Sequence, residues 1–381
     1  MKILVIHTRY VEKGGEDSLV DLEINLLRQE HEVELLQFQN KSGWRGLIQF
    51  LFSIWNPAAG KKVRRKILDF RPDLVHVHNW HFAAGPIVFH AVAKQGIPIV
   101  ATLHNYRILC PSATLFHHEK LFFESLKNGF PWRAVQKKTY RNSILLSFWL
   151  SLILYFHRKI GTWNFVDSYL VPSASMLPFF EQVPWKFPMN KVIVKPNFTE
   201  PAPTSNKEKT NFLYVGRLSE EKGIRSLLDA FIKTKQPLLI AGDGPLKPLI
   251  TDATSKYNWI RYAGSLNKPK VNDELTAASA LIVPSIWQEP FGMVIIESFA
   301  HGTPVIAANI GAPAHLIQHN FNGLLFEPGN AASIAEAVQQ WNKFSIFQKK
   351  QMSANAIRTY EEYYTPKKNL QELNRIYQSC M

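Results

Sequence analysis

The chain has 381 residues, of which 46% are hydrophobic and 19% charged, enough for two ordinary globular cores. Its two cysteines, Cys110 and Cys380, lie far apart, and no apolar leader precedes the strand-like residues 1–6. These features predict a reduced cytoplasmic protein without a signal peptide, and exclude a disulfide-stabilised secreted fold.

The formal net charge is +14, and residues 41–141 hold 16 Lys and Arg against 4 Asp and Glu. That excess favours a phosphorylated partner or an anionic membrane surface, or is simply a soluble basic surface.

Short apolar runs alternate with helix-length segments along most of the chain, which predicts an α/β fold of two doubly wound Rossmann-like domains. The expected strands of the first domain are residues 3–7, 33–37, 74–78, 99–103, 168–172 and 192–195. Those of the second are residues 212–215, 238–241, 260–263, 280–284, 304–307 and 323–326. We expect domains at 1–196 and 211–362, a Pro-rich polar linker at 197–210, and a C-terminal helix at 363–381 packing back on the first domain.

Two apolar segments of the first domain require separate interpretation. Residues 44–55 place Trp44, Leu47, Ile48, Leu51 and Trp55 at helical spacing, ahead of the basic residues 61–66. This pattern is typical of a helix resting on a membrane, or of a helix that packs the same stripe into a core. Residues 144–156 carry no charge but are shorter than the roughly 18 residues that a spanning helix needs, so we expect a buried helix.

Glycine-rich turns follow several of the expected strands. Gly14 and Gly15 allow positive φ and close backbone approach, and a helix starting near Glu16 would point its N-terminus at a phosphate. A plain turn is the alternative. In the second domain, Arg217 and Lys222 follow a strand closely enough to converge on a diphosphate.

The alternative for that basic segment is an exposed turn balanced by Glu220 and Glu221. A third glycine-rich turn, with Gly242 and Gly244, again follows a strand.

The most informative motif is Glu289-Pro-Phe-Gly-Met-Val-Ile-Ile-Glu297. Pro290 and Gly292 argue against a continuous helix, so Glu289 should lie on the loop and Glu297 in the helix that follows. The loop and the helix N-terminus form a seat for an anion or a phosphorylated sugar. Two carboxylates beside that seat can accept hydrogen bonds from sugar hydroxyls. A charged helix start with one solvated Glu is the alternative.

Metal ligands are sparse. No Asp-x-Asp sequence occurs, so a divalent metal held by carboxylates has no evident ligand set. His76 and His78, on one face of an expected strand in the run from His76 to His81, raise the alternative of a zinc site. No fourth ligand of suitable spacing accompanies them, and we favour a strand end that lines a cleft.

These motifs occur in an order that resembles the retaining glycosyltransferases of family 4, which have the GT-B fold. The resemblance spans almost the whole chain and rests on Gly14-Gly15, Thr102-Leu103-His104-Asn105, Gly216-Arg217 with Lys222-Gly223, Gly242-Asp243-Gly244-Pro245, Glu289 to Glu297, and Gly302-Thr303-Pro304-Val305. The segment 101–111 is also similar to a bacterial subgroup that builds surface polysaccharides.

The resemblance implies a role for each matching residue. Arg217 and Lys222 would hold the diphosphate, Glu297 the ribose hydroxyls, and Glu289 the donor sugar, which His104 would face. The remaining donor-binding positions implied by the resemblance are glycines and backbone groups: Gly15, Gly216, Gly242, Gly244, Phe291, Gly292 and Met293. Glu289, His104, Arg217 and Lys222 are then the candidate catalytic residues.

The resemblance further implies a metal-independent hexosyltransferase that transfers sugar from a nucleotide-diphosphate-sugar to a glycan or lipid-linked acceptor, with retention of configuration. Cell-surface polysaccharide or lipopolysaccharide biosynthesis is the implied setting, on the cytoplasmic side, with peripheral attachment to the membrane through the basic first domain. No cofactor other than the co-substrate is implied, and no nucleic acid. The alternatives are a sugar-nucleotide epimerase or phosphorylase on the same fold, or a basic nucleic-acid-binding protein, although no signature of the last is present.

Overall fold

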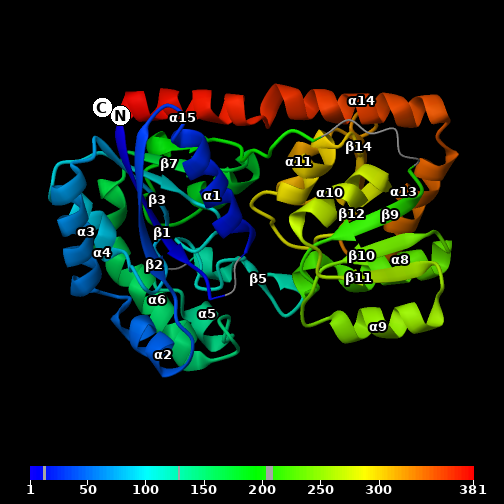
Figure 1. The fold of residues 1–381 in the computed structure, drawn as a ribbon. Helices are drawn as coiled ribbons and strands as arrows, with labels where there is room; N and C mark the ends of the chain where they lie inside the picture. The colour runs from blue at the N-terminus through cyan, green and yellow to red at the C-terminus, as the bar shows by residue number, and fades with distance from the viewer. Residues whose placement is uncertain (12–13, 128, 203–208) are drawn as a thin grey trace. The chain divides into compact units, whose positions relative to one another are not determined.

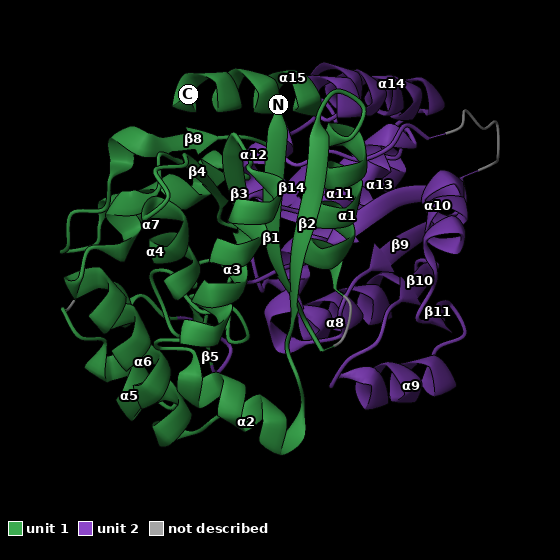
Figure 2. Ribbon diagram, turned by 60° about the vertical axis from the view of Figure 1, so that its left-hand side comes forward, with its two compact units in different colours: residues 1–117, 122–196, 369–381 green, residues 118–121, 197–368 purple. Residues whose placement is uncertain are grey.

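A computed structural model describes residues 1–11, 14–127, 129–202 and 209–381, and its contacts divide the chain into two compact units (Figures 1 and 2). Unit 1 comprises Met1–His117, Phe122–Pro196 and Asn369–Met381. Unit 2 comprises His118–Leu121 and Asn197–Lys368. Each unit contains its own six-stranded sheet, so each is described separately.

The sheet of unit 1 is parallel throughout, with the strand order β2-β1-β3-β4-β7-β8. Chain order reverses direction across the sheet between β1 and β3, the position where doubly wound sheets bind ligands. The expected strands of the first domain are confirmed, within a few residues at their ends. They are β1 (Lys2–Arg9), β2 (Glu32–Gln39), β3 (Leu74–Asn79), β4 (Ile99–Thr102), β7 (Ser168–Val171) and β8 (Val192–Val194).

Helices cover both faces of this sheet. On one face, Val63 and Ile67 of α3 and Val88 of α4 pack against Val75 and Val77 of β3. On the other face lie α1 and the C-terminal helix α15 (Figure 1). The helices of unit 1 are α1 (Gly15–Leu27), α2 (Gly43–Phe52), α3 (Pro57–Phe70), α4 (Ile87–Ala93), α5 (Trp132–Gln136), α6 (Ile144–Lys159), α7 (Leu177–Glu181) and α15 (Pro366–Cys380).

The sheet of unit 2 is also parallel, with the order β11-β10-β9-β12-β13-β14 and its reversal between β9 and β12. This is the Rossmann order, and the expected strands of the second domain are confirmed. They are β9 (Asn211–Val215), β10 (Leu238–Ala241), β11 (Ile260–Gly264), β12 (Ala278–Val283), β13 (Val305–Ala308) and β14 (Gly323–Phe326).

Two apolar layers bury the sheet of unit 2. Helices α8 and α13 pack on one face through Leu227 and Ile334, and helices α11 and α14 pack on the other through Ile296 and Tyr360. The helices of unit 2 are α8 (Ile224–Thr234), α9 (Lys247–Lys256), α10 (Lys268–Ala277), α11 (Met293–Ala300), α12 (Pro313–Leu316), α13 (Ala331–Lys343) and α14 (Ile346–Tyr363).

A short hairpin of β5 (Phe116–His117) and β6 (Lys120–Leu121) was not predicted.

The segment expected as a linker, residues 197–210, includes residues 203–208, which lie outside the described residues. Its first part is packed rather than extended into solvent. Phe198 is fully buried, and the backbone N–H of Thr199 donates to the carbonyl of Tyr364 at 3.1 Å. At the C-terminus, Leu370, Leu373 and Ile376 of α15 are buried, and this helix belongs to unit 1 from Asn369 onward.

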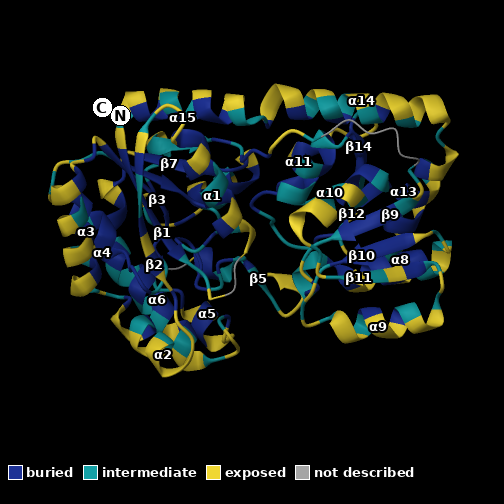
Figure 3. Cartoon of the chain, viewed as in Figure 1, coloured by how far each residue is buried: buried dark blue, intermediate teal, exposed yellow. Residues whose placement is uncertain are grey.

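The two apolar segments of unit 1 differ from a simple core arrangement. In α2 only Phe50 is buried, while Trp44, Leu47 and Leu51 are exposed (Figure 3). The α2 stripe therefore does not pack into a core. Helix α6 buries Leu150, Ile153 and Leu154 along one face, but its first turns expose Ile144, Leu145 and Phe148. The prediction of a buried helix over 144–156 is thus wrong for its beginning, where Phe148 packs against the exposed Trp132 of α5 and Ile144 and Leu145 are more than half exposed.

Among the residues that the structure describes, no helix combines the length and the apolar character needed to cross a bilayer.

Candidate functional site

The loop that follows β9 is held tightly against the loop that follows β10. The N–H of Gly216 donates to Ala241 at 3.0 Å, and that of Leu218 to Asp243 at 2.9 Å. Gly242 and Gly244 have φ of +144° and +156°, and a Cβ on Gly242 would lie 1.8 Å from the carbonyl oxygen of Gly216. The two glycines therefore let the loops approach, and the space beside their Cα atoms is filled by backbone.

Lys222 and Glu289 meet at the point where the strand order of unit 2 reverses. Lys222 ends the 3₁₀ turn Glu220–Lys222 after β9, and Glu289 lies on the loop after β12. The Lys222 Nζ is 2.6 Å from Glu289 Oε1, and the Ser285 hydroxyl donates to Glu289 Oε2 at 2.7 Å. The Lys222 ammonium also lies 5.5 Å from the centre of the Trp287 ring, within cation–π range.

Backbone contacts lock these two loops together. Gly223 has φ +69°, and a Cβ there would lie 1.9 Å from the carbonyl oxygen of Pro284. The N–H of Ile286 donates to Glu221 at 2.9 Å. Gly311, after β13, has φ +60° and sits against the backbone of Glu289, to which Ala312 also donates. The position of Glu289 is therefore set from three strand ends.

Glu297 is the fifth residue of α11, so the expectation that Glu289 is on the loop and Glu297 in the helix is confirmed. Its Oε1 is 2.5 Å from Lys268 Nζ at the start of α10. Gly292 is the N-cap of α11, Met293 begins the helix, and the Phe291 side chain is buried in the core beneath it. Phe291 can thus offer a ligand only its backbone.

Arg217 is exposed directly after β9, and its carbonyl accepts a hydrogen bond from the Tyr214 hydroxyl at 2.8 Å. The structure therefore brings Gly216, Arg217, Lys222, Glu289 and the start of α11 to the carboxyl edge of one sheet. Sequence reasoning missed Ser285, Trp287, Lys268 and Gly311. Lys268 and Gly311 come from other parts of unit 2, so their positions beside Glu297 and Glu289 depend on tertiary packing. Ser285 and Trp287 share the loop of Glu289, where no motif singled them out.

The two remaining predicted site residues, Gly15 and His104, belong to unit 1. Gly15 is the first residue of α1, as the helix start expected near Glu16 predicted, and the N-cap Gly14 has φ −112°, so this pair does not use the positive φ that glycine allows. Nothing lies within 4 Å of a Cβ built on either glycine, which leaves the helix start open on that side. Glu12 and Lys13, in the same turn, lie outside the described residues.

His104 follows β4 and lies in a polar pocket with His78, Asn79, Thr102 and Asn105. Its Nε2 is 3.1 Å from Nδ1 of His78. Burial, reinforced by the charge that His78 would carry, lowers the pKa of His104 well below its usual value. The imidazole is therefore neutral at pH 7 and available to exchange hydrogen bonds with a hydroxyl.

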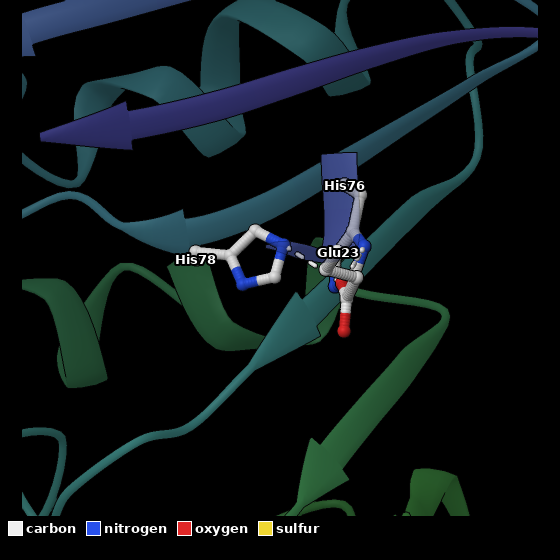
Figure 4. A group of neighbouring side chains, drawn as sticks. All are labelled: Glu23, His76 and His78. Carbon is white, nitrogen blue, oxygen red and sulfur yellow. Dashed lines mark ion pairs between the residues drawn. The ribbon is translucent and has the colours of Figure 1, made fainter. Parts of the chain in front are cut away.

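A buried polar network lies behind this pocket, between the sheet and helices α1 and α15. Figure 4 shows Glu23 beside His76 and His78, whose ligand-type atoms lie within 4.8 Å of one another. The Lys195 ammonium donates to Glu23 Oε2 at 2.8 Å. His76 is hydrogen-bonded on both nitrogens, to the hydroxyls of Tyr377 and Thr102.

The electrostatics of this cluster suit an internal ion pair. Burial would raise the pKa of the Glu23 carboxyl, but the Lys195 ammonium and the neighbouring His78 and His76 hold it well below its usual range. Burial also keeps the pKa of His76 low, so this imidazole is neutral. A zinc ion bound by this cluster would be a cation beside Glu23. The Lys195 ammonium already occupies that role, because it pairs with the Glu23 carboxylate.

The fold, the Lys222–Glu289 site of unit 2 and the His104 pocket of unit 1 together define the class of protein. The chain is a two-domain, doubly wound α/β protein that carries its buried and paired polar side chains at the carboxyl ends of its strands, where such sheets bind nucleotides. The family model described as Glycosyl transferases group 1 matches residues 197–359, and the model described as Glycosyltransferase Family 4 matches residues 13–202. The chain belongs to the family 4 glycosyltransferases, as its motifs predicted.

Individual relatives agree with this assignment. An uncharacterized glycosyltransferase of Methanocaldococcus jannaschii is 32% identical over 165 residues, covering 41% of this chain and 42% of the relative. Glycogen synthase of Mycobacterium tuberculosis is 26% identical over 298 residues, covering 74% of this chain and 63% of the relative. The chain thus spans less than two thirds of these relatives. HepE of Anabaena, solved in complex with UDP, aligns over 100% of both chains with a TM-score of 0.70 at 19% identity, a likeness of GT-B fold.

The Glu23–Lys195 pair predicts a large stability effect. Replacing Lys195 by Met would leave a buried, unpaired carboxylate, and we expect unit 1 to lose about 3–5 kcal/mol of unfolding free energy. Hydrogen exchange of the β3 amides would measure this loss within unit 1. Adding Glu23→Gln to Lys195→Met should recover part of it, because the lone charge is then removed.

Lys137→Met is the matched control for Lys195→Met. Lys137 forms an ion pair with Glu124 at 3.3 Å, but both side chains are nearly half exposed. Its loss should cost about 0–1 kcal/mol. Equal effects of the two substitutions would contradict the account of the network.

Proposed function

We propose that this protein transfers a hexose from a nucleotide-diphosphate-sugar to a glycan or lipid-linked acceptor, with retention of anomeric configuration. The observation that carries the proposal is the Lys222–Glu289 pair at the switch point of unit 2. A cation and a carboxylate fixed together at that point suit a ligand that presents both a phosphate and sugar hydroxyls. The UDP complex of HepE, a protein of the same fold, supports a nucleotide ligand.

The chemistry follows from the charges. In this proposal the donor diphosphate replaces Glu289 as the partner of Lys222, and the exposed Arg217 adds a second cation. Both cations then stabilise the charge that grows on the diphosphate as the glycosidic bond breaks. Glu289, released from Lys222, accepts hydrogen bonds from the donor sugar, and Glu297 does so from the ribose. The leaving phosphate oxygen takes the acceptor proton as the new bond forms on the same face of the sugar.

Cell-surface polysaccharide or lipopolysaccharide assembly on the cytoplasmic face of the membrane is the setting that we propose. The large basic excess of residues 41–141 supports an acceptor or a surface that is anionic.

The donor site predicts the effect of two substitutions. Lys222→Ala and Glu289→Ala should each lower turnover by about 10²–10³, because each removes a preorganised group beside the departing charge or the sugar. A thermal-shift screen of UDP- and GDP-sugars would select the donor, and release of the nucleoside diphosphate on adding acceptor would measure turnover. That release also separates a transferase from an epimerase.

Lys247→Ala is a suitable control for these variants. Lys247 is an exposed lysine of unit 2 that pairs with Asp243 at 3.6 Å. Its loss should leave turnover unchanged. Turnover near that of the wild type in Lys222→Ala or Glu289→Ala would remove that residue from the proposed site.

Metal independence is part of the proposal, because Lys222 and Arg217 are assigned the role of neutralising the diphosphate. We expect sugar transfer to continue at an undiminished rate after exhaustive treatment with EDTA. Measuring nucleoside diphosphate release with and without the chelator tests this. A complete loss of activity that Mg²⁺ or Mn²⁺ restores would overturn it.

The exposed apolar side chains of unit 1 support peripheral membrane attachment. Helices α2, α5 and α6 lie together at one end of unit 1 in both views (Figures 1 and 2), and we define the docking face as nine exposed residues of these helices. They are Trp44, Leu47, Ile48, Leu51 and Phe52 of α2, Trp132 of α5, and Ile144, Leu145 and Phe148 of α6. Helices α2 and α6 touch through the Trp149 indole N–H, which donates to the carbonyl of Phe50 at 2.9 Å.

The basic residues around the docking face indicate that its binding partner is an anionic bilayer. No Asp or Glu occurs in residues 40–68 or 125–166, whereas the exposed Arg45, Arg133, Lys138 and Arg141 lie on or next to its helices. Apolar side chains rimmed by cations match an interface between acyl chains and anionic headgroups. The basic cluster at 61–66 contributes less than its sequence implies, because Lys66 pairs with Glu34 and Arg65 with Asp69.

Sedimentation with liposomes tests the docking face. Binding should rise with the fraction of anionic lipid and fall with salt. Trp44 is 68% exposed and Leu145 79%, so replacing both by Ser should remove about 3 kcal/mol of insertion energy, roughly a hundredfold in affinity. Neutralising Lys61, Lys62, Arg64, Arg65 and Lys66 should weaken binding less.

The matched control lies in unit 2, where Ile346 and Phe347 are each 75% exposed. Replacing both by Ser should leave liposome binding unchanged. Equal binding of the wild type to neutral and anionic vesicles, or an equal loss in both pairs of Ser variants, would contradict the assignment of this face.

A further inference from the structure

Arg107 lies between two pockets of unit 1 that differ sharply in character. The polar pocket contains His104 and is lined mainly by residues after β3 and β4. The other pocket is narrow and mostly apolar, with Phe82, Leu150, Ile153, Leu154 and Trp163 in its wall. Of the residues that line them, only Arg107 and Trp80 line both. The guanidinium thus stands at the boundary between a polar and an apolar compartment.

The Arg107 guanidinium lacks a matched partner among the described residues. Its Nε and Nη1 atoms are buried and have no hydrogen-bond acceptor among the described residues, and the carboxyl whose pKa its charge affects is that of Glu16 in the polar pocket. The side chain lies 6.0 Å from the ring centre of Tyr10, a weak interaction by comparison. Arg107 is partly exposed as a residue, but leaving these two buried donors unpaired is costly, so they indicate a missing acceptor.

Glu16, in the polar pocket, does not fill that role. Its carboxylate accepts a hydrogen bond from the Tyr10 hydroxyl at 2.9 Å. Burial raises the pKa of Glu16 to about 7, although the Arg107 charge and the Tyr10 hydroxyl oppose the shift. Glu16 therefore carries only part of a negative charge at neutral pH, and Arg107 keeps its capacity for an anion.

The surroundings of Arg107 specify the kind of anion. A guanidinium fork matches two oxygens of a phosphate or carboxylate. The aromatic and aliphatic wall on one side accepts a hydrocarbon chain, and the histidines and amides on the other accept sugar hydroxyls. An amphiphile with a phosphate between its chain and its sugar satisfies all three. We propose that Arg107 binds the phosphate of a lipid-phosphate-linked acceptor, with the first part of the apolar chain against Trp80 and α6 and the acceptor sugar toward His104.

The helix α6 links this subsite to the docking face. Its buried face lines the apolar pocket with Leu150, Ile153 and Leu154, and its first turns expose Ile144 and Leu145. A chain that leaves the pocket along α6 would therefore stay against apolar side chains. Calling this site an acceptor subsite rests on the proposed transferase function. Binding of an amphiphilic phosphate at Arg107 can be measured without any catalysis.

Calorimetric titration with decyl phosphate, below its micelle concentration, tests the subsite directly. We expect Arg107→Gln to weaken binding at least about tenfold and Arg107→Lys to weaken it less, because a lysine keeps the charge but not the fork. Arg64→Gln removes the same charge from an exposed position on α3 and should leave the affinity unchanged. Unfolding temperatures of all variants, and UDP affinity within twofold of the wild type, would show that the fold and the donor site are intact.

Two further ligands separate the contributions of phosphate and chain. Inorganic phosphate and decyl maltoside should each bind the wild type at least about tenfold more weakly than decyl phosphate does. If inorganic phosphate binds as tightly, the site takes a free anion and the proposal is wrong. If Arg107→Gln leaves decyl phosphate binding within twofold, or weakens UDP binding equally, Arg107 is not an acceptor residue.

Failure of the transferase function remains distinguishable. Decyl phosphate bound through Arg107 without any sugar transfer from a nucleotide sugar would overturn the proposed function alone. Sugar transfer with an unchanged KM for acceptor in Arg107→Gln would overturn the subsite alone.

Discussion

The ion pair between Lys222 and Glu289 is the constraint on which the candidate donor site of unit 2 depends. It joins the loops after β9 and β12, the two central strands between which the order of the sheet reverses. Gly223 and Gly311 let neighbouring backbone approach these loops, and Ser285 fixes the second oxygen of Glu289. The site is therefore rigid before any ligand arrives, and a ligand phosphate has to compete only with one carboxylate for Lys222.

In unit 1, buried charged groups near the switch point of the sheet are balanced within the unit. A carboxylate from α1 and an ammonium that follows β8 lie buried beside the histidines of β3, and this internal pair of Glu23 and Lys195 balances the charge. Burial lowers the pKa of His76 and His104 well below the usual value, so both are neutral, which leaves His104 able to donate or accept a hydrogen bond. Arg107 is the exception to this balance, since its charge has no matched acceptor in the described parts of the unit. The two units thus differ in chemistry, since unit 2 has a paired cation at its switch point and unit 1 has polar and apolar pockets side by side.

The sequence predicted both parallel sheets, because buried parallel strands appear as short, nearly continuous apolar runs whose length separates them from helices. It also placed Arg217, Lys222 and Glu289 on the loops that follow strands and Glu297 in the helix after its loop. Periodicity did not determine which way the stripe of α2 faces, since a stripe for a core and a stripe for a bilayer have the same spacing. The absence of charge in residues 144–156 likewise led us to expect more burial at the beginning of α6 than the structure has.

Long-range partners could not be derived from local pattern. Glu23 and Lys195 are 172 residues apart, and Lys222 and Glu289 are 67 apart, so their contact depends on strand order. The contact of Lys268 with Glu297 joins α10 to α11 and is equally non-local, whereas Ser285 reaches Glu289 within one loop. Gly14 does not use the positive φ open to glycine, because an extended N-cap whose N–H donates to the Asp17 side chain starts α1 without it.

The most direct test of the central claim is a calorimetric titration of UDP into the wild-type protein and into Lys222→Gln. If Lys222 exchanges Glu289 for a diphosphate, UDP should bind the wild type and bind Lys222→Gln at least about tenfold more weakly, a loss of about 1.4 kcal/mol. Gln keeps the length of a polar side chain but lacks the charge, so the loss would report the cation itself. Equal UDP affinity in the two proteins would contradict the claim that this ion pair forms the donor site.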